Sequence, residues 1–180
     1  MNKIDRALAW ALGLLQLMAG ASGAAWVSMQ LQFHLMMMAA GENPVDWGPL
    51  FPGLPWVLGV GVLSLVATAA GVCLFLVPRH GARLALLAML PQAFGFLTAA
   101  LLYSLTLGPD WGVELAFDCE TALCTLEQTT YRPPGWTTML QVDTDRSPIW
   151  LGVSVNFAVL LQGMLACWIL WKTRRQGKPR

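Results

Sequence analysis

The sequence predicts an all-α membrane protein, a four-transmembrane-helix bundle with both termini in the cytoplasm and a disulfide-bearing external loop between helices 3 and 4. Three observations predict it: long charge-free stretches, a hydrophobic content of 56% in 180 residues, and the sorting of the charges along the chain. A helix needs about 20 apolar residues to cross a bilayer core. The stretches without Asp, Glu, Lys or Arg all exceed that length and cover residues 7–41, 47–78, 84–109 and 147–171. Polar faces at helical spacing, which soluble helices need, are missing from them.

The charged residues between these stretches predict the orientation. With the N-terminus inside, the inner segments hold nine Lys and Arg residues against the single acid Asp5, a net charge of +8. The outer segments hold nine acids against Arg132 and Arg146, a net charge of −7. An excess of Lys and Arg marks the cytoplasmic side of a membrane protein. Both termini are therefore expected in the cytoplasm.

The first two spans are expected over residues 7–38 and 54–77. The first is longer than a perpendicular crossing needs, so it should tilt or protrude. A cleaved signal peptide is the competing interpretation, because Lys3 and Arg6 precede the apolar run. It is disfavoured because the apolar character continues unbroken to Ala40. Pro78 is expected to end the second span.

The third span is expected over residues 82–107 and the fourth over residues 148–171. Pro91 lies inside the third and removes a backbone hydrogen bond, which predicts a kink. We favour a fixed packing kink over a functional hinge. The external loop then covers residues 108–147 and the basic cytoplasmic tail residues 172–180, so that 1–180 form one membrane domain.

Cys119 and Cys124 lie in the predicted external loop. Two thiols this close in an oxidising compartment are expected to form a disulfide. It would close a small loop on a hairpin built from residues 113–117 and 124–131, which alternate as short strands do. The alternative is a membrane thiol oxidoreductase, but active pairs of that kind are typically Cys-x-x-Cys. We therefore favour a structural disulfide.

Tryptophans and glycines are the candidate partner-binding residues. Tryptophan prefers the headgroup layer of a membrane or an interface. Small residues near four-residue spacing let helices approach closely in lipid. The candidates on these two grounds are Trp47, Trp111, Trp136, Gly20 and Gly23.

The outer end of the first span holds a candidate metal site. Thioether and imidazole ligands suit Cu(I), and the residues that supply them are His34, Met29, Met37 and Met38. The competing interpretation is that methionine fills gaps at an apolar interface. We favour gap filling by methionine, so no cofactor is predicted. Copper and a quinone are the alternative cofactors.

The sequence lacks a recognised catalytic motif. The spans carry no acid or strong base, which disfavours ion conduction and secondary transport. The predicted function is a non-catalytic membrane accessory, scaffold or assembly subunit that binds another integral membrane protein, or a second copy of itself, through helix faces and the external loop. Alternatives are the thiol oxidoreductase and a subunit that binds lipid or quinone. Membrane lipids are expected around the spans, and nucleic-acid binding has no support. The missing Asn-x-Ser/Thr site favours a bacterial inner membrane.

Overall fold

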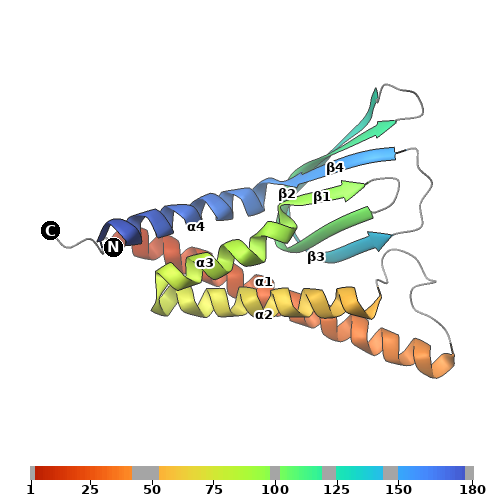
Figure 1. Cartoon of the computed structure of the whole chain (residues 1–180), viewed down its shortest axis with the longest axis horizontal. Coiled ribbons are helices and arrows are strands. Elements are labelled where there is room, and N and C mark those ends of the chain that lie inside the picture. The colour runs from red at the N-terminus through yellow and green to blue at the C-terminus, as the bar shows by residue number, and fades with distance from the viewer. Residues whose placement is uncertain (1–2, 42–52, 98–101, 119–124, 144–149, 177–180) are drawn as a thin grey trace.

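The computed structural model describes residues 3–41, 53–97, 102–118, 125–143 and 150–176. Its elements in chain order are α1 (Lys3–Ala40), α2 (Leu54–Leu76), α3 (Pro78–Met89), the 3-10 turn η2 (Leu90–Gln92), β1 (Phe94–Leu97), β2 (Leu102–Asp118), β3 (Thr125–Asp143), β4 (Trp150–Asn156) and α4 (Phe157–Gln176). α3 and α4 lie at the end of the molecule that holds both termini, α1 and α2 extend side by side to the opposite end, and the strands lie beyond α3 and α4 on one side of α1 and α2 (Figure 1).

The prediction of a four-transmembrane-helix bundle is wrong. The strands form an antiparallel sheet, and among the described helices only α1 and α2 are long and apolar enough to cross a membrane. α3 has 12 residues and is too short to cross. Length and composition of this kind also occur in core helices of soluble proteins, so α1 and α2 alone support membrane association weakly.

The predicted third span, residues 82–107, is the first large error. α3 ends at Met89, a single 3-10 turn follows, and the chain then enters β1 and the start of β2. Pro91 lies in that turn, where it has no N–H to continue the helix. The proline therefore accompanies a helix end instead of a kink. The turn between α2 and α3 also comes earlier than expected, at Val77.

The predicted fourth span, residues 148–171, is the second large error of the sequence-based prediction. Its residues 150–156 form β4, in which Val153 and Val155 are two residues apart and so share a face of the strand. β4 satisfies its backbone groups by pairing with β1 on one side and β2 on the other. The helix begins at Phe157, after Asn156, whose Oδ1 accepts a hydrogen bond from Val159 N–H at 3.2 Å. Asn156 therefore caps α4.

The sheet has the order β1-β4-β2-β3, and the start of β2 also pairs with β1. β2 makes this possible by bending in its middle. Gly108 has a φ of +106°, which suits glycine, and the register with β3 shifts between Asp110 and Gly112. A Cβ on Gly112 would collide with Val155 O. The result is a curved β2–β3 ribbon. Within the described residues it contains the strands of the predicted hairpin, since Val113 pairs with Tyr131 and Phe117 with Leu126.

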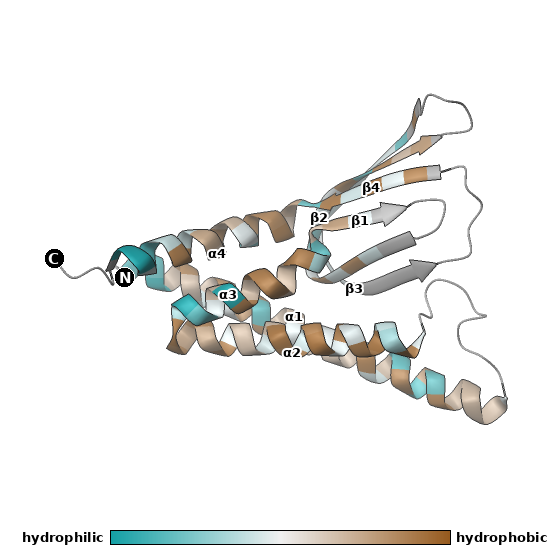
Figure 2. Ribbon diagram, viewed as in Figure 1, coloured by the Kyte–Doolittle hydropathy of each residue, from teal (hydrophilic) through white to brown (hydrophobic). Residues whose placement is uncertain are grey.

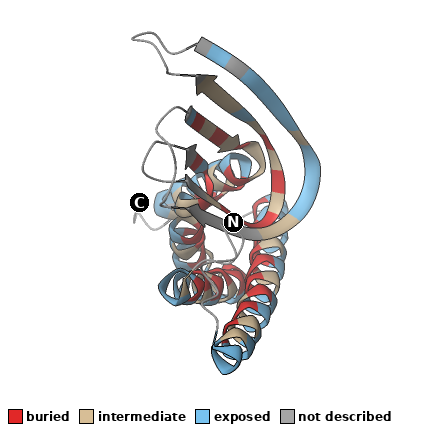
Figure 3. Cartoon of the chain, turned by 90° about the vertical axis from the view of Figure 1, so that its right-hand side faces the viewer, coloured by how far each residue is buried: buried red, intermediate tan, exposed pale blue. Residues whose placement is uncertain are grey.

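Two apolar clusters hold the parts together. One joins α1, α2, α3 and α4 around Leu12, Leu74 and Ile169, all of them fully buried. The other joins α1, α2 and β2 around Trp26, Val57 and Leu105. Figure 3 shows the buried residues on the sides of the helices that face one another and the exposed residues on their outer sides.

Candidate functional site

α1 and α2 pack closely where glycines remove the side chains between them. A Cβ on Gly20 would lie 2.8 Å from Ser64 O, and a Cβ on Gly71 would lie 2.8 Å from Gly13 O. Real Cβ atoms do not approach backbone oxygens this closely, so neither helix could sit where it does with alanine at these positions. The contact fixes the crossing of the two helices.

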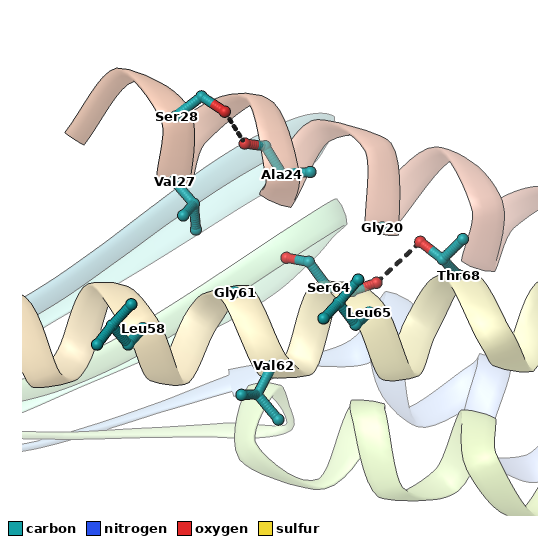
Figure 4. Close-up of a pocket in the computed structure, with 10 residues that line it drawn as sticks. All are labelled: Gly20, Ala24, Val27, Ser28, Leu58, Gly61, Val62, Ser64, Leu65 and Thr68. Carbon is teal, nitrogen blue, oxygen red and sulfur yellow. Dashed lines mark hydrogen bonds between the residues drawn. The ribbon is translucent and has the colours of Figure 1, made fainter. Parts of the chain in front are cut away.

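A groove opens beside this crossing, with a volume of about 590 Å³. Gly20, Ala24 and Gly61 leave its centre without bulk, and the side chains of Val62 and Leu65 stand at its margin on α2 (Figure 4). Both of these side chains are exposed. The remaining lining residues are Val27, Ser28, Leu58, Ser64 and Thr68.

The hydroxyl groups around the groove each donate a hydrogen bond to a backbone carbonyl of their own helix. Ser28 Oγ donates to Ala24 O at 3.0 Å, Ser64 Oγ to Val60 O at 2.8 Å, and Thr68 Oγ1 to Ser64 O at 2.9 Å. Such bonds to the carbonyl four residues back are common for Ser and Thr inside helices. The hydroxyl hydrogens are therefore not available to a ligand, and the rest of the groove surface is hydrocarbon. Such a groove suits an apolar occupant better than one that needs hydrogen-bond donors.

The predicted partner-binding glycines lie at this contact. Gly20 lines the groove and packs against Thr68, whereas Gly23 is buried against Ser64 and the Leu107 side chain of β2. Gly23 therefore serves packing within the chain, and Gly20 serves both the packing and the groove.

The predicted tryptophans lie elsewhere. Trp111 Nε1 donates to Tyr131 Oη at 2.8 Å, and its ring meets Phe157 edge to face at 5.6 Å, so it ties the β2–β3 ribbon to the start of α4. Trp136 is exposed on β3 and lies over Gly108. Trp47 lies outside the described residues.

The predicted disulfide also falls outside the described ranges, because Cys119 and Cys124 belong to the gap between residues 118 and 125. The described cysteines are the half-buried Cys73 and the exposed Cys167, and both are free. The disulfide has no support from the described residues, and both it and the thiol oxidoreductase alternative stay predictions.

The candidate copper residues are spread over different environments. His34 is buried, with its Nδ1 2.8 Å from Gln30 O, whereas Met29 and Met38 are exposed and Met37 is half-buried. His34 Nε2 is buried and has no hydrogen-bond partner within the described part of the chain. Groups of three or more His, Cys, Asp or Glu residues close enough to bind a metal do not occur among the described residues.

Comparison with protein-family models, with curated proteins and with solved structures finds no match. The site is therefore interpreted from its geometry alone.

Sequence reasoning missed the half of the groove that α2 provides. Gly61, Ser64 and Thr68 follow one another on α2 at three- and four-residue spacing. Gly20, Ala24 and Ser28 do so on α1 at four-residue spacing. The small residues on each helix were visible in the sequence. Which two stripes face one another depends on the tertiary packing, which the spacing does not encode.

Proposed function

We propose that this chain is a non-catalytic accessory subunit of a membrane, held there by α1 and α2, and that the groove between these helices binds an apolar helix of another integral membrane protein. The supporting observation is the polarity of the helices, which is inverted relative to a water-soluble protein.

Polar side chains lie inside the helical part of the molecule. Gln16 of α1, Ser64 of α2 and Gln162 of α4 are all buried. Large apolar side chains lie outside: Leu14 and Met18 on α1, Val62 and Leu65 on α2, and Leu161 and Met164 on α4 are exposed. Brown and pale segments predominate over teal ones along the helices in the hydropathy view (Figure 2). Soluble monomers rarely expose apolar surface this extensive, and lipid is the solvent that favours it.

The charges support a cytoplasmic placement of the end of the molecule that holds both termini. The described basic residues at this end are Lys3, Arg6, Arg79, Arg83, Lys172, Arg174 and Arg175, and the acid there is Asp5. They start α1, start α3 and end α4, so one face of the membrane would receive them all. By the positive-inside rule that face is the cytoplasmic one, and in a bacterium the membrane is the inner one.

A helix suits the groove better than a polar ligand does. The hydroxyls along it are occupied, and in lipid close backbone contact over small residues is a main source of helix association. The exposed aromatic residues of β3, Tyr131 and Trp136, supply a second apolar surface for the same partner.

Filling the groove tests the proposal. Ala24 and its neighbour Ala25 are both exposed on α1, but only Ala24 lines the groove. The pair Ala24→Leu and Ala25→Leu therefore matches size, hydrophobicity and helix propensity. A photoreactive residue at Val62 of α2 reports what occupies the groove in native membranes.

The proposal expects a defined protein cross-link from Val62 that disappears with Ala24→Leu and persists with Ala25→Leu. A cross-link to a second copy of this chain would replace the accessory role with self-association. A cross-link to lipid alone would overturn partner binding at the groove, as would equal effects of the two leucine variants.

A further inference from the structure

A second pocket lies at the basic end of the molecule, between the start of α1, the end of α2 and the start of α3. Its volume is about 360 Å³, and it is lined by Arg6, Ala9, Trp10, Leu74, Phe75, Leu76 and Pro78. Unlike the groove, this pocket combines a cation with an apolar wall.

Arg6 is the charged group of the pocket. It is exposed, and it takes part in no ion pair with another residue of the described ranges. A guanidinium presents several N–H donors in a planar fork, which matches the oxygens of a phosphate. Asp and Glu are absent from the residues that line the pocket.

The start of α3 adds to this electrostatic preference. Pro78 lines the pocket and occupies the first turn of α3, where the described residues provide no side-chain cap. The dipole of α3 favours negative charge at such a position. The dipole is the contribution of this helix, because Pro78 has no N–H and the N–H groups of His80 and Gly81 donate to Val77 O. Arg79 follows Pro78 directly on α3 and adds positive charge beside the pocket.

The opposite wall of the pocket is aromatic and aliphatic. The rings of Trp10 and Phe75 pack at 6.1 Å between centroids. Trp10 is 50% exposed and Leu76 is 75% exposed, so the apolar wall continues onto the outer surface of α1 and α2. A ligand that fits both parts has an anionic head and a hydrocarbon tail.

We propose that this pocket binds the phosphate of an anionic phospholipid, with Arg6 as the anion-binding residue and the acyl chains along Trp10 and Leu76. The proposal rests on the membrane setting of the proposed function and adds a defined lipid site to it. Free phosphate shares the charge of the headgroup but cannot use the apolar wall.

Lipid binding in neutral detergent micelles tests the site without the surface potential of a charged bilayer. The intact chain is titrated with phosphatidylglycerol, phosphatidylcholine or inorganic phosphate, and bound lipid is counted by native mass spectrometry. Arg6→Gln removes the pocket cation. Arg83→Gln is the matched control, because Arg83 is an exposed arginine of the same end that does not line the pocket.

We expect one phosphatidylglycerol to bind preferentially, Arg6→Gln to weaken it about tenfold or more, and Arg83→Gln to change it by less than about twofold. Arg6→Lys, which keeps the charge, should bind with intermediate strength and shows that the pocket is still folded. Equal weakening by Arg6→Gln and Arg83→Gln would overturn the site in favour of diffuse attraction. Competition by inorganic phosphate at similar concentrations would overturn the role of the acyl chains.

The outcome is distinguishable from a failure of the proposed function. If the protein resists alkaline extraction from membranes yet shows no preference for phosphatidylglycerol, the lipid site is wrong and the membrane setting stands. If the protein is extracted, the membrane setting itself is wrong.

Discussion

Gln16 of α1 donates from Nε2 to Oε1 of Gln162 of α4 at 3.1 Å, and both side chains are more than nine-tenths buried. The bond joins helices that are far apart in the sequence. It also explains how two amides are tolerated among apolar side chains, since a buried donor of Gln16 and the buried acceptor of Gln162 satisfy one another.

Replacing one partner of this pair should destabilise the protein. We expect Gln16→Leu to lower the free energy of unfolding by about 1–2 kcal/mol in detergent, because the Gln162 amide is left buried without its partner. The double variant with Gln162→Leu should recover part of that loss. Unfolding of the four proteins of this cycle measures the coupling, and strictly additive losses would contradict a direct bond.

The α1–α2 crossing should be sensitive to one methyl group. Gly20→Ala places a Cβ 2.8 Å from Ser64 O, so we expect a loss of about 1–3 kcal/mol in unfolding free energy. Gly59→Ala is the control on α2, because a Cβ there meets no atom within 4 Å. Alanine is the better helix former, so this variant should be neutral or more stable. A Gly20→Ala protein as stable as the control would contradict the close packing.

The sequence predicted α1 and α2 well and the second half of the chain poorly. The expected spans 7–38 and 54–77 lie almost wholly within α1 and α2, because an unbroken apolar run of that length leaves few alternatives. Residues 94–97 and 102–107 are equally apolar but form strands. Hydropathy does not separate a buried strand from a buried helix, and the pairing that decides it, such as Phe94 with Val155, joins distant parts of the chain.

The candidate site could also be predicted only in part from the sequence. The spacing of Gly20 and Gly23 indicated a close helix contact, which the structure contains. The groove itself required knowing that Gly20 and Ala24 lie beside Gly61, and no local pattern supplies that information. Asn156 shows the same limit, since its role as a cap became visible only once α4 was known to begin at Phe157.

The cap of α4 should contribute measurably to stability. Asn156 accepts from Val159 N–H and donates from Nδ2 to Pro109 O at 3.3 Å, linking the helix to the bend of β2. Asn156→Ala removes both bonds and should cost about 1–2 kcal/mol in thermal or chemical unfolding. Asn156→Asp keeps the acceptor and should lose less. Equal losses would show that capping is not the main contribution.

Gln92 should be the most sensitive polar residue between α3 and the sheet. Its Oε1 accepts from Leu107 N–H at 2.9 Å, and its Nε2 donates to Ala88 O at 2.6 Å. We expect Gln92→Leu to cost about 1–3 kcal/mol, because the buried Leu107 N–H loses its partner. The exposed Gln128→Leu change on β3 should stay within about 0.5 kcal/mol. A loss of unfolding free energy in Gln92→Leu as small as that in Gln128→Leu would contradict the role of Gln92 as the partner of Leu107 N–H.

Labelling of a single cysteine tests the lipid environment of α2 most directly. Leu65 is 72% exposed on the protein surface, so its access to reagents depends on what surrounds the protein. In a variant free of native cysteines, Leu65→Cys and Arg83→Cys are treated with a water-soluble maleimide in native membranes. We predict that the cysteine at position 83 reacts rapidly in opened vesicles while the one at position 65 stays unlabelled until detergent unfolds the protein. Equal labelling of both positions in native membranes would contradict the account.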